Sequence, residues 1–528
     1  MNPPLLRTLI DAQATALADQ PFLTFEGHTY SYRQTDHASN RAANLLRELG
    51  VRPQDRVAVL LPNSQHFVFV WLALIKLNAT MTPLNIQLKG DTLHYQLHHS
   101  APRLLITTRS LLPNVEAVRH ALPDDCRVLV IDRDPNVHGP LDHGFDYQSL
   151  FNQASGERPP DVRVDDEDLA LILYTSGTTG RPKGVMINRR AQTHHPTYYH
   201  ADLLRTARGE TAYTYLPLFH VTSMGVTMGQ WVGGGHVALD EDFNVFGFWD
   251  RIRQHQAVVF PYLGAVLSML HARPPRPDDA DNPARFALGA AAPVAIWKSF
   301  EQRFGLQLLE TYGQSEWVAV WVQHPRGKTR VGAAGVAPAR ADVQVVDAND
   351  ARVPPNTAGE IVMRPTQPHL MMTGYYNNPE LTAQVFREGW YHTGDVGSLD
   401  EDGYLTFKGR LKDYIRRRGE NISSFDIEQV VNQHPAVLEC AAVGVPSALS
   451  EDEVKLCVVL RPESLAQPPT AEVLWRYCKQ TLPHFMVPRY IEILDALPRT
   501  ATHRVRKFVL AEQGVAGAWD CKAKPRGL

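Results

Sequence analysis

The chain has 528 residues, with 53 lysine and arginine side chains against 56 aspartate and glutamate side chains. This length is too great for one hydrophobic core and predicts two or more domains. The near balance of charge gives no net field to attract nucleic acid or an anionic membrane, so we expect a small or locally recognised partner. No secretory signal and no stretch of ~18 apolar residues for a membrane span is evident. We therefore expect a cytoplasmic protein.

The cysteines are scattered along the chain, with no CxxC pair and no histidine at the spacing of a zinc site. This pattern indicates neither a disulfide framework nor a structural metal, and it predicts ordinary reduced thiols. The five residues are Cys126, Cys440, Cys457, Cys478 and Cys521.

Helical and strand patterns alternate over most of the chain. The predicted elements are a helix over residues 31–50 that stops at Gly50, a buried strand over 55–63, a helix over 67–79, and strands over 103–108, 127–132 and 169–175. Strands that alternate with helices favour mainly parallel sheets with covered faces. The fold class predicted for the N-terminal part is therefore α/β, with mainly parallel sheets flanked by helices.

The pattern changes near residue 400, where the stretch LDEDGYLTFKGRLKDYIRRRG is polar, turn-rich and dense in charge. A short α+β pattern resumes after it, over residues 439–482. We therefore predict a boundary close to Lys412, which gives a large N-terminal domain over residues 1–411 and a small α+β domain over residues 412–528.

An apolar strand runs directly into the loop YTSGTTGRPKG, residues 174–184. Its glycines allow close approach of the backbone, its successive amides can form an anion-binding nest, and its hydroxyls and Lys183 add donors. The spacing differs from GxxxxGK[ST], which excludes the common nucleoside-triphosphatase loop. A flexible surface linker is the alternative, but linkers seldom follow directly on a buried strand. The stretch predicts a phosphate-binding loop.

Seven motifs in this order resemble those of the adenylate-forming enzymes, a family that includes acyl-CoA synthetases, firefly luciferase and the adenylation domains of peptide synthetases. They are YTSGTTGRPKG (174–184), YLPLFH (215–220), GAAAP (289–293), TYGQSE (311–316), YHTGD (391–395), GRLKDYIRRRGENI (409–422) and LPRTATHRVRK (497–507). In this family an acid reacts with ATP to give an acyl-adenylate and pyrophosphate. A second nucleophile, commonly the thiol of coenzyme A, then displaces AMP. The resemblance thus implies ATP, Mg²⁺ and coenzyme A as cofactors.

The resemblance assigns nucleotide-binding roles to residues of these motifs. Tyr312 resembles the residue that stacks on adenine, Asp395 the carboxylate that holds the ribose hydroxyls, and Arg410 an arginine that meets ribose or phosphate. Glu316, with Thr175, resembles the magnesium site. The other residues expected at the nucleotide are Ser176, Gly177, Thr178, Thr179, Gly180, Lys183, Gly289, Ala290, Ala291, Gly313, Gln314 and Ser315. A core tyrosine and a surface aspartate in a turn are the structural alternatives for Tyr312 and Asp395.

The resemblance also implies a mobile C-terminal domain. Lys412 occupies the hinge position about which the small domain rotates between the two half-reactions. Gly419, Glu420 and Asn421 resemble the segment that lines the pantetheine channel of coenzyme A. The arginines at 416–418 read as a solvated basic turn, except as contacts to coenzyme A phosphates.

The acid is expected beside YLPLFH. His220 resembles the histidine that flanks the acid pocket, with a packed core histidine as the alternative. The acyl group is expected among Val221, Thr222, Trp317 and Val318, next to residues 289–293. If Trp317 points inward it narrows the pocket, which favours a short or compact acid.

One departure from the family pattern falls on a residue of the catalytic set, which we predict as His220, Glu316, Lys183 and Arg504. The family usually has Thr-Gly-Lys where this chain has Thr-His-Arg at residues 502–504. That lysine bridges the carboxylate and the α-phosphate, and an arginine delivers the same charge as a longer planar fork. Three outcomes are open: Arg504 substitutes, Lys507 or Arg506 reaches in instead, or adenylation is weak.

The function expected from the resemblance is ATP-dependent ligation of a small or medium carboxylic acid to coenzyme A. The closing pattern over residues 507–524 resembles the tails of synthetases that act on crotonobetaine, carnitine and other small acids. An adenylating enzyme that passes the acyl group to an amine or a carrier protein is the alternative within this chemistry. A non-catalytic nucleotide-binding relative is the alternative of another class, motivated by Arg504. A homodimer would be in keeping with relatives of this kind.

Overall fold

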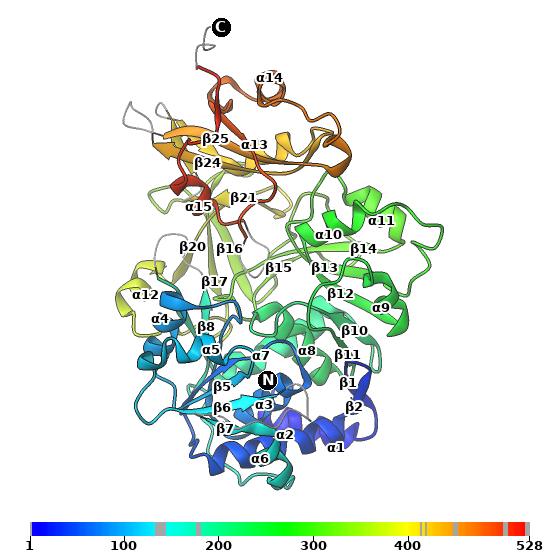
Figure 1. Ribbon diagram of the computed structural model, residues 1–528, viewed down its shortest axis with the longest axis vertical. Coiled ribbons are helices and arrows are strands. Elements are labelled where there is room, and N and C mark those ends of the chain that lie inside the picture. The colour runs from blue at the N-terminus through cyan, green and yellow to red at the C-terminus, as the bar shows by residue number, and fades with distance from the viewer. Residues whose placement is uncertain are drawn as a thin grey trace. The chain divides into compact units, whose positions relative to one another are not determined.

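The computed structural model of the protein describes residues 3–132, 144–175, 181–411, 414–417, 420–446, 452–499 and 505–522. The chain forms two compact units (Figure 1). The first comprises Met1–Asp342 and Pro365–Phe386, and the second comprises Val343–Arg364 and Arg387–Leu528. Lys412 lies outside the described residues, so the domain boundary at this residue stays a prediction.

The first sheet of the N-terminal unit carries the start and the end of the predicted phosphate loop. Its strands run in the order β18-β9-β8-β4-β3-β5-β6-β7. They are β3 (Arg56–Leu60), β4 (Thr80–Pro83), β5 (Leu104–Thr108), β6 (Arg127–Ile131), β7 (Phe145–Asp146), β8 (Leu169–Thr175), β9 (Lys183–Asn188) and β18 (Gly374–Tyr375). Strands β3 to β8 pair in parallel, and β9 and β18 add antiparallel pairs at one edge.

The second sheet of this unit carries two further motifs. Its order is β15-β14-β13-β12-β10-β11-β1-β2. Neighbouring strands from β14 to β1 in this order pair in parallel, and the edge strands β2 and β15 pair antiparallel with β1 and β14. The strands are β1 (Pro21–Phe25), β2 (His28–Ser31), β10 (Thr211–Thr214), β11 (His236–Leu239), β12 (Ala257–Leu263), β13 (Phe286–Ala290), β14 (Gln307–Tyr312) and β15 (Val322–Gln323). The prediction of mainly parallel sheets is confirmed.

Helices flank both sheets, as predicted. They are α1 (Leu6–Ala16), α2 (Tyr32–Glu48), α3 (Gln65–Lys76), α4 (Gly90–Ser100), α5 (Leu112–Glu116), α6 (Tyr147–Gln153), α7 (Arg189–Tyr198), α8 (Val221–Gly233), α9 (Phe248–Gln254), α10 (Gly264–His271), α11 (Trp297–Phe304) and α12 (Pro379–Val385), with short turns of helix η1 (Arg119–Ala121) and η2 (Tyr199–Leu204). Helix α2 begins at a capping box, in which the side chains of Ser31 and Gln34 each accept a hydrogen bond from the backbone N–H of the other. Gly50, the predicted stop, has φ +89° just after the helix.

The core beside the second sheet explains why its helices form where they do. Helices α9, α10 and α11 bring apolar faces against β12, β13 and β14, and Figure 1 shows these elements side by side. Trp297, Phe300 and Phe304 recur at helical spacing on α11, and each is at most 1% exposed. This packing holds the carboxyl ends of β12, β13 and β14 in place, where the GAAAP and TYGQSE motifs begin.

The second unit is built on antiparallel strands and one small mixed sheet. Its first strands are β16 (Ala341–Val346), β17 (Gly359–Pro365), β19 (Phe386–Arg387), β20 (Trp390–Leu399) and β21 (Leu405–Arg410), and a hairpin follows, β22 (Tyr414–Arg417) and β23 (Glu420–Ser423). The last sheet has the order β24 (Val437–Pro446), β25 (Asp452–Leu460), β26 (Tyr490–Ile493) and β27 (Trp519–Asp520). Its helices are α13 (Ser424–Val431), α14 (Ala471–Thr481) and α15 (Lys507–Glu512), with short turns η4 (Pro462–Ser464) and η5 (His484–Met486).

Alternation along β24 and β25 divides this unit into two cores. Ala442 and Val458 belong to the cluster that α13 and α14 cover, whereas Ala441 and Val459 belong to the cluster that α15 covers. Successive residues of a strand point to opposite faces, so both faces of this sheet are buried. The small α+β domain predicted from the sequence pattern is confirmed as a fold.

One prediction about the basic turn is wrong. Arg417 was expected in a solvated stretch, but it is 8% exposed and forms an ion pair with Glu453, at 2.6 Å between Nη2 and Oε2. Its Nη1 also donates to the carbonyl oxygens of Phe485 and Val487, at 3.0 and 2.9 Å. A buried guanidinium needs such partners, so Arg417 ties β22 to the segment after α14.

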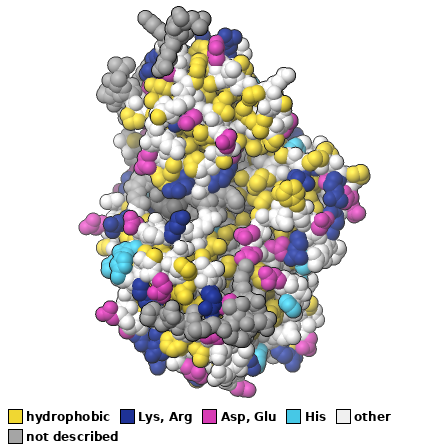
Figure 2. All heavy atoms as spheres, in the orientation of Figure 1, with side chains coloured by type: hydrophobic (Ala, Val, Ile, Leu, Met, Phe, Trp, Pro, Cys, Tyr) yellow, Lys and Arg dark blue, Asp and Glu magenta, His cyan; other side chains and the backbone are white. Residues whose placement is uncertain are grey.

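Three general features of the described residues relate to the sequence predictions. All five cysteines are free thiols, and four of them are buried. Figure 2 shows lysine and arginine mixed with aspartate and glutamate over the face that it draws. Across the described ranges, no helix is both long enough and apolar enough to cross a membrane.

Candidate functional site

The two ends of the predicted phosphate loop lie opposite each other. Thr175 at the end of β8 and Lys183 at the start of β9 are paired in the antiparallel register of these strands. Residues 176–180 lie outside the described residues, so Ser176, Gly177, Thr178, Thr179 and Gly180 stay predictions. The strand register alone brings a hydroxyl and an ammonium group to the two sides of the loop.

Tyr375 connects this loop to the predicted magnesium ligand. Its hydroxyl donates to Oε1 of Glu316 at 2.9 Å, and Lys183 Nζ lies 5.0 Å from the centre of its ring. Strand β18, which carries Tyr375, pairs with β9, and Met372 N–H donates to the Glu316 carbonyl oxygen at 2.9 Å. The structure thus brings Lys183 and Glu316, far apart in the sequence, to the same tyrosine.

The donor chemistry at Glu316 fits a hard cation. Glu316 is 7% exposed. Thr175, the register partner of Lys183 at the end of β8, offers a hydroxyl as a second candidate oxygen donor. Mg²⁺ commonly takes one or two protein oxygens and fills its other positions with phosphate and water. Within the described ranges no cluster of three or more His, Cys, Asp or Glu side chains could hold a metal. A cation at Glu316 would fill its other positions with phosphate and water.

The GAAAP loop, residues 289–293, lies directly beside the TYGQSE motif. Gly289 and Glu310 are register partners in the parallel pair of β13 and β14, and Thr311 Oγ1 donates to the Gly289 carbonyl oxygen at 2.9 Å. A Cβ at Gly289 would overlap the carbonyl oxygen of Tyr262, so only glycine fits there. Ala290 ends β13, and Ala291 has φ +63°, a left-handed conformation that is strained for alanine.

Glu310 holds this loop, and sequence reasoning missed it. Its carboxylate accepts hydrogen bonds from the backbone N–H groups of Ala291 and Ala292, the second at 3.0 Å. Tyr262 OH donates to Oε2 at 2.8 Å. Burial raises the pKa of the Glu310 carboxyl from its ordinary value of 4.5 to about 7, although these hydrogen bonds oppose the shift. The carboxyl therefore titrates near neutral pH, in direct contact with the backbone of the GAAAP loop.

Tyr312 and the residues after it form a compact turn. Tyr312 is 8% exposed, and its ring packs edge-on against Trp317 with 5.1 Å between ring centres. The backbone N–H of Trp317 donates to the Gln314 carbonyl oxygen at 3.0 Å. A Cβ at Gly313 would overlap the ring of Trp321, which explains the glycine.

His220 is positioned by a residue that carries no motif. It is the N-cap residue of α8, and its ring lies 4.6 Å from that of Phe219. Asn63, which is 4% exposed and follows β3, donates to the Leu216 carbonyl oxygen at 3.0 Å and accepts from Leu218 N–H at 2.7 Å. Asn63 therefore fixes the YLPLFH segment that ends at His220.

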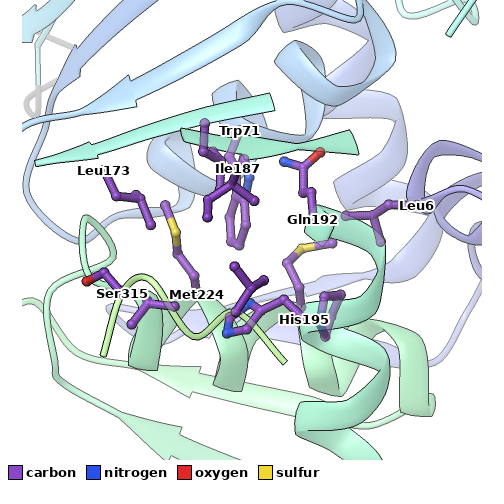
Figure 3. A pocket seen from close by; sticks show the side chains of 13 residues that line it. Leu6, Trp71, Leu173, Ile187, Gln192, His195, Met224 and Ser315 are labelled. Carbon is purple, nitrogen blue, oxygen red and sulfur yellow. The ribbon is translucent and has the colours of Figure 1, made fainter. Parts of the chain in front are cut away.

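A small cavity lies next to this turn, lined from β8, β9, α1, α3, α7, α8 and the segment after β14 (Figure 3). Val221 and Val318, two of the four predicted acid-pocket residues, line it together with Ser315. Thr222 and Trp317 do not line it, and Trp317 is fully buried against Tyr312. Ser315 was predicted to contact the nucleotide, and it also lines this cavity. The cavity therefore adjoins the predicted phosphate-binding residues.

Two predicted ribose residues meet in the second unit. Asp395 on β20 and Arg410 on β21 are register partners, with 3.3 Å between Arg410 Nε and Asp395 Oδ1. Asp395 is 3% exposed, so it is not the surface aspartate of the structural alternative. Lys507, offered as a substitute for Arg504, is held within this unit by Glu428 at 2.8 Å.

Comparisons with known proteins agree with this arrangement. The model of the AMP-binding enzyme family matches residues 10–376, and that of the AMP-binding enzyme C-terminal domain matches residues 426–504. The chain belongs to the AMP-binding enzyme family. The predicted resemblance to adenylate-forming enzymes is therefore confirmed.

Several relatives of this AMP-binding enzyme are CoA ligases by name. The crotonobetaine/carnitine–CoA ligase of Salmonella paratyphi B is 31% identical over 520 residues, which cover 95% of this chain and 98% of the relative. The solved structure of a benzoate CoA ligase from Burkholderia xenovorans LB400 has a TM-score of 0.86 at 22% identity and covers 96% of this chain and 100% of its own. O-succinylbenzoate coenzyme A synthetase from Bacillus subtilis, in complex with AMP, has a TM-score of 0.80 at 25% identity and covers 95% of this chain and 97% of its own.

Part of the predicted site of this AMP-binding enzyme lies outside the described residues. This holds for Lys412, Gly419 and Arg504, and for the side chains of Glu420 and Asn421. Their roles stay predictions.

Proposed function

We propose that this protein is an ATP-dependent ligase that activates a small or medium carboxylic acid as its acyl-adenylate and transfers the acyl group to coenzyme A, releasing pyrophosphate and AMP. One observation carries the proposal. Tyr375 brings Lys183 and Glu316 together, and Ser315, the neighbour of Glu316, lines the cavity that the acid would enter. Groups suited to phosphate and metal thus adjoin a pocket suited to an acyl group.

Each residue has a distinct part in the proposed first half-reaction. Thr175 and Lys183 would bind the phosphates, and Gly289 to Ala291 would contact the nucleotide. Tyr312 would stack on adenine, and Asp395 would bind the ribose hydroxyls. Glu316 and Thr175 would hold Mg²⁺, which neutralises phosphate charge when it is bound. His220, at the start of α8, would orient the acid carboxylate.

The second half-reaction uses residues near the predicted hinge. We infer that residues 412–528 rotate about Lys412 so that Gly419, Glu420 and Asn421 line the path of the coenzyme A thiol. Arg504 would stabilise charge on the α-phosphate in the first step, in place of the usual lysine. ATP and coenzyme A are cytoplasmic metabolites, and the free cysteines suit that compartment, so we propose a cytoplasmic enzyme.

The test is acid-dependent release of pyrophosphate by the purified protein with ATP and Mg²⁺, with and without coenzyme A. We expect turnover that requires coenzyme A and falls at least about 100-fold in Glu316→Gln, because the metal loses its carboxylate ligand. Glu380→Gln, exposed on α12, is the matched control and should match the wild type. Release that requires an amine in place of coenzyme A would favour amide synthesis. No release with any acid, together with retained ATP binding, would favour the non-catalytic alternative.

A further inference from the structure

The cavity beside Ser315 is lined by a buried histidine whose function is unassigned. His195 on α7 is 8% exposed, and its Nε2 has no hydrogen-bond partner among the described residues. In Figure 3 its ring lies across the cavity from Trp71 and Ile187. Burial lowers the pKa of His195 to about 4, so the ring is neutral at physiological pH. A buried polar atom without a partner is costly, and a bound molecule that supplies a partner removes that cost.

The other polar side chains in the wall are few. Gln192 lines the cavity, but its Oε1 accepts a hydrogen bond from Arg189 Nη1 at 2.9 Å. Arg189 is held in turn by Asn78 Oδ1 at 2.8 Å and by the Ala79 carbonyl oxygen at 2.7 Å. The indole Nε1 of Trp71, another wall residue, is also buried without a hydrogen-bond partner among the described residues. Apart from Trp71, His195, Gln192 and Ser315, the described residues of the wall carry no polar side-chain atoms that form ordinary hydrogen bonds. The cavity therefore suits an uncharged, mostly apolar group with few hydrogen-bonding atoms.

We propose that the acid taken by this enzyme is a short hydroxy acid with no charged group besides its carboxylate, and that His195 Nε2 binds its hydroxyl group. This inference rests on the proposed function. A hydroxyl group suits either neutral tautomer of the ring, because it can donate to a bare Nε2 or accept from Nε2–H. The acid carboxylate would lie on the Ser315 side of the cavity, toward the predicted nucleotide.

The size of the cavity limits the length of the acid. Its volume is about 20 Å³, which is room for about one water molecule. Met224 and Met228 on α8 line it, and their unbranched side chains can change rotamer to admit a few more carbons. A long fatty chain would need the packed strands and helices of the wall to separate.

The same wall disfavours a quaternary ammonium group. Such a cation is bound by carboxylates or by several aromatic faces together. The described wall has no carboxylate, and Trp71 is its one large aromatic side chain. We therefore expect this enzyme to differ from the relatives named crotonobetaine/carnitine–CoA ligase in its choice of acid.

The test compares acids that differ by one hydroxyl group. Rates of AMP formation with MgATP and coenzyme A are measured for butanoate, 3-hydroxybutanoate, 4-hydroxybutanoate and crotonobetaine. The wild type, His195→Leu and His194→Leu are compared. His194 is the matched control, because it is the adjacent buried histidine on the same helix and does not line the cavity.

We expect the wild type to prefer one hydroxybutanoate over butanoate by at least about 10-fold in kcat/KM, and to use crotonobetaine least. His195→Leu should remove or reverse this preference and leave the KM for ATP unchanged, whereas His194→Leu should keep the preference. Equal use of butanoate and both hydroxybutanoates by the wild type would overturn the inference alone, and so would a preference for crotonobetaine. The comparison of acids on the wild type tests the inference even if His195→Leu does not fold. No turnover of any acid would overturn the proposed function as well.

Discussion

Replacing Glu310 by glutamine should change how the stability of the protein depends on pH. The pKa of this carboxyl is about 7 in the folded protein and 4.5 in its ordinary state, and the cause is burial. Between these pH values the folded protein holds a proton that the unfolded chain has released. The free energy of unfolding therefore falls as pH rises through this window, by at most about 1.4 kcal/mol per pH unit. Above pH 7 the ionised carboxylate lowers the free energy of unfolding by about 3 kcal/mol relative to the protonated form.

Glutamine does not ionise, so the variant lacks this cost. Its amide nitrogen replaces one oxygen that accepts an N–H from Ala291 or Ala292, and the lost hydrogen bond costs about 1 kcal/mol. We expect wild type and Glu310→Gln to have nearly equal free energies of unfolding at pH 5. At pH 8 the variant should be more stable by about 2 kcal/mol.

Urea denaturation followed by tryptophan fluorescence at pH 5, 6, 7 and 8 measures this difference. Other titrating groups are common to both proteins and cancel when the two curves are subtracted. Glu380→Gln, an exposed position, controls for the substitution itself. A difference between Glu310→Gln and wild type that stays constant from pH 5 to pH 8 would refute the reasoning, because Glu310 would then be ionised in the folded protein throughout.

Three further predictions concern the contacts that support the site. Gly264→Ala would place a Cβ against the carbonyl oxygen of Ala291, and the displacement of the GAAAP loop, which is predicted at the nucleotide, should raise the KM for ATP at least about 10-fold, with little change in the KM for the acid. Tyr375→Phe removes the hydrogen bond to Glu316, and a magnesium titration of the rate should show that several-fold more Mg²⁺ is needed for half-maximal activity. Lys455 is 0% exposed, and its Nζ lies 2.7 Å from Glu492 Oε2. Lys455→Met leaves the Glu492 carboxylate without this partner, so it should destabilise the second unit by about 3 kcal/mol in a denaturation experiment, unlike Lys479→Met at the end of α14.

Local patterns predicted the elements of the fold well because their causes are local. Helix α2 follows from apolar spacing, the cap at Ser31 and the stop at Gly50, all within one short stretch. Strand β8 follows from a continuous apolar run before the glycine-rich loop. The motif residues of the site were found because their order along the chain resembles that of a family.

The supporting residues could not be found in this way, because their partners come from distant strands. Glu310 meets Ala291 only through the register of β13 and β14, and Tyr375 meets Glu316 only because β18 pairs with β9. His195 lies on a helix without any motif. Arg417 was misread because a run of arginines usually indicates a solvated surface, and its partner Glu453 lies on another strand.

The most direct test of the central claim follows one oxygen atom. Butanoate or a hydroxybutanoate labelled with ¹⁸O in both carboxylate oxygens is incubated with the protein, MgATP and coenzyme A, and AMP is analysed by mass spectrometry. An acyl-adenylate leaves one carboxylate oxygen on the α-phosphate when the thiol displaces AMP, so the account predicts AMP with one ¹⁸O and an equal amount of acyl-CoA. Unlabelled AMP, or labelled AMP without the thioester, would contradict it.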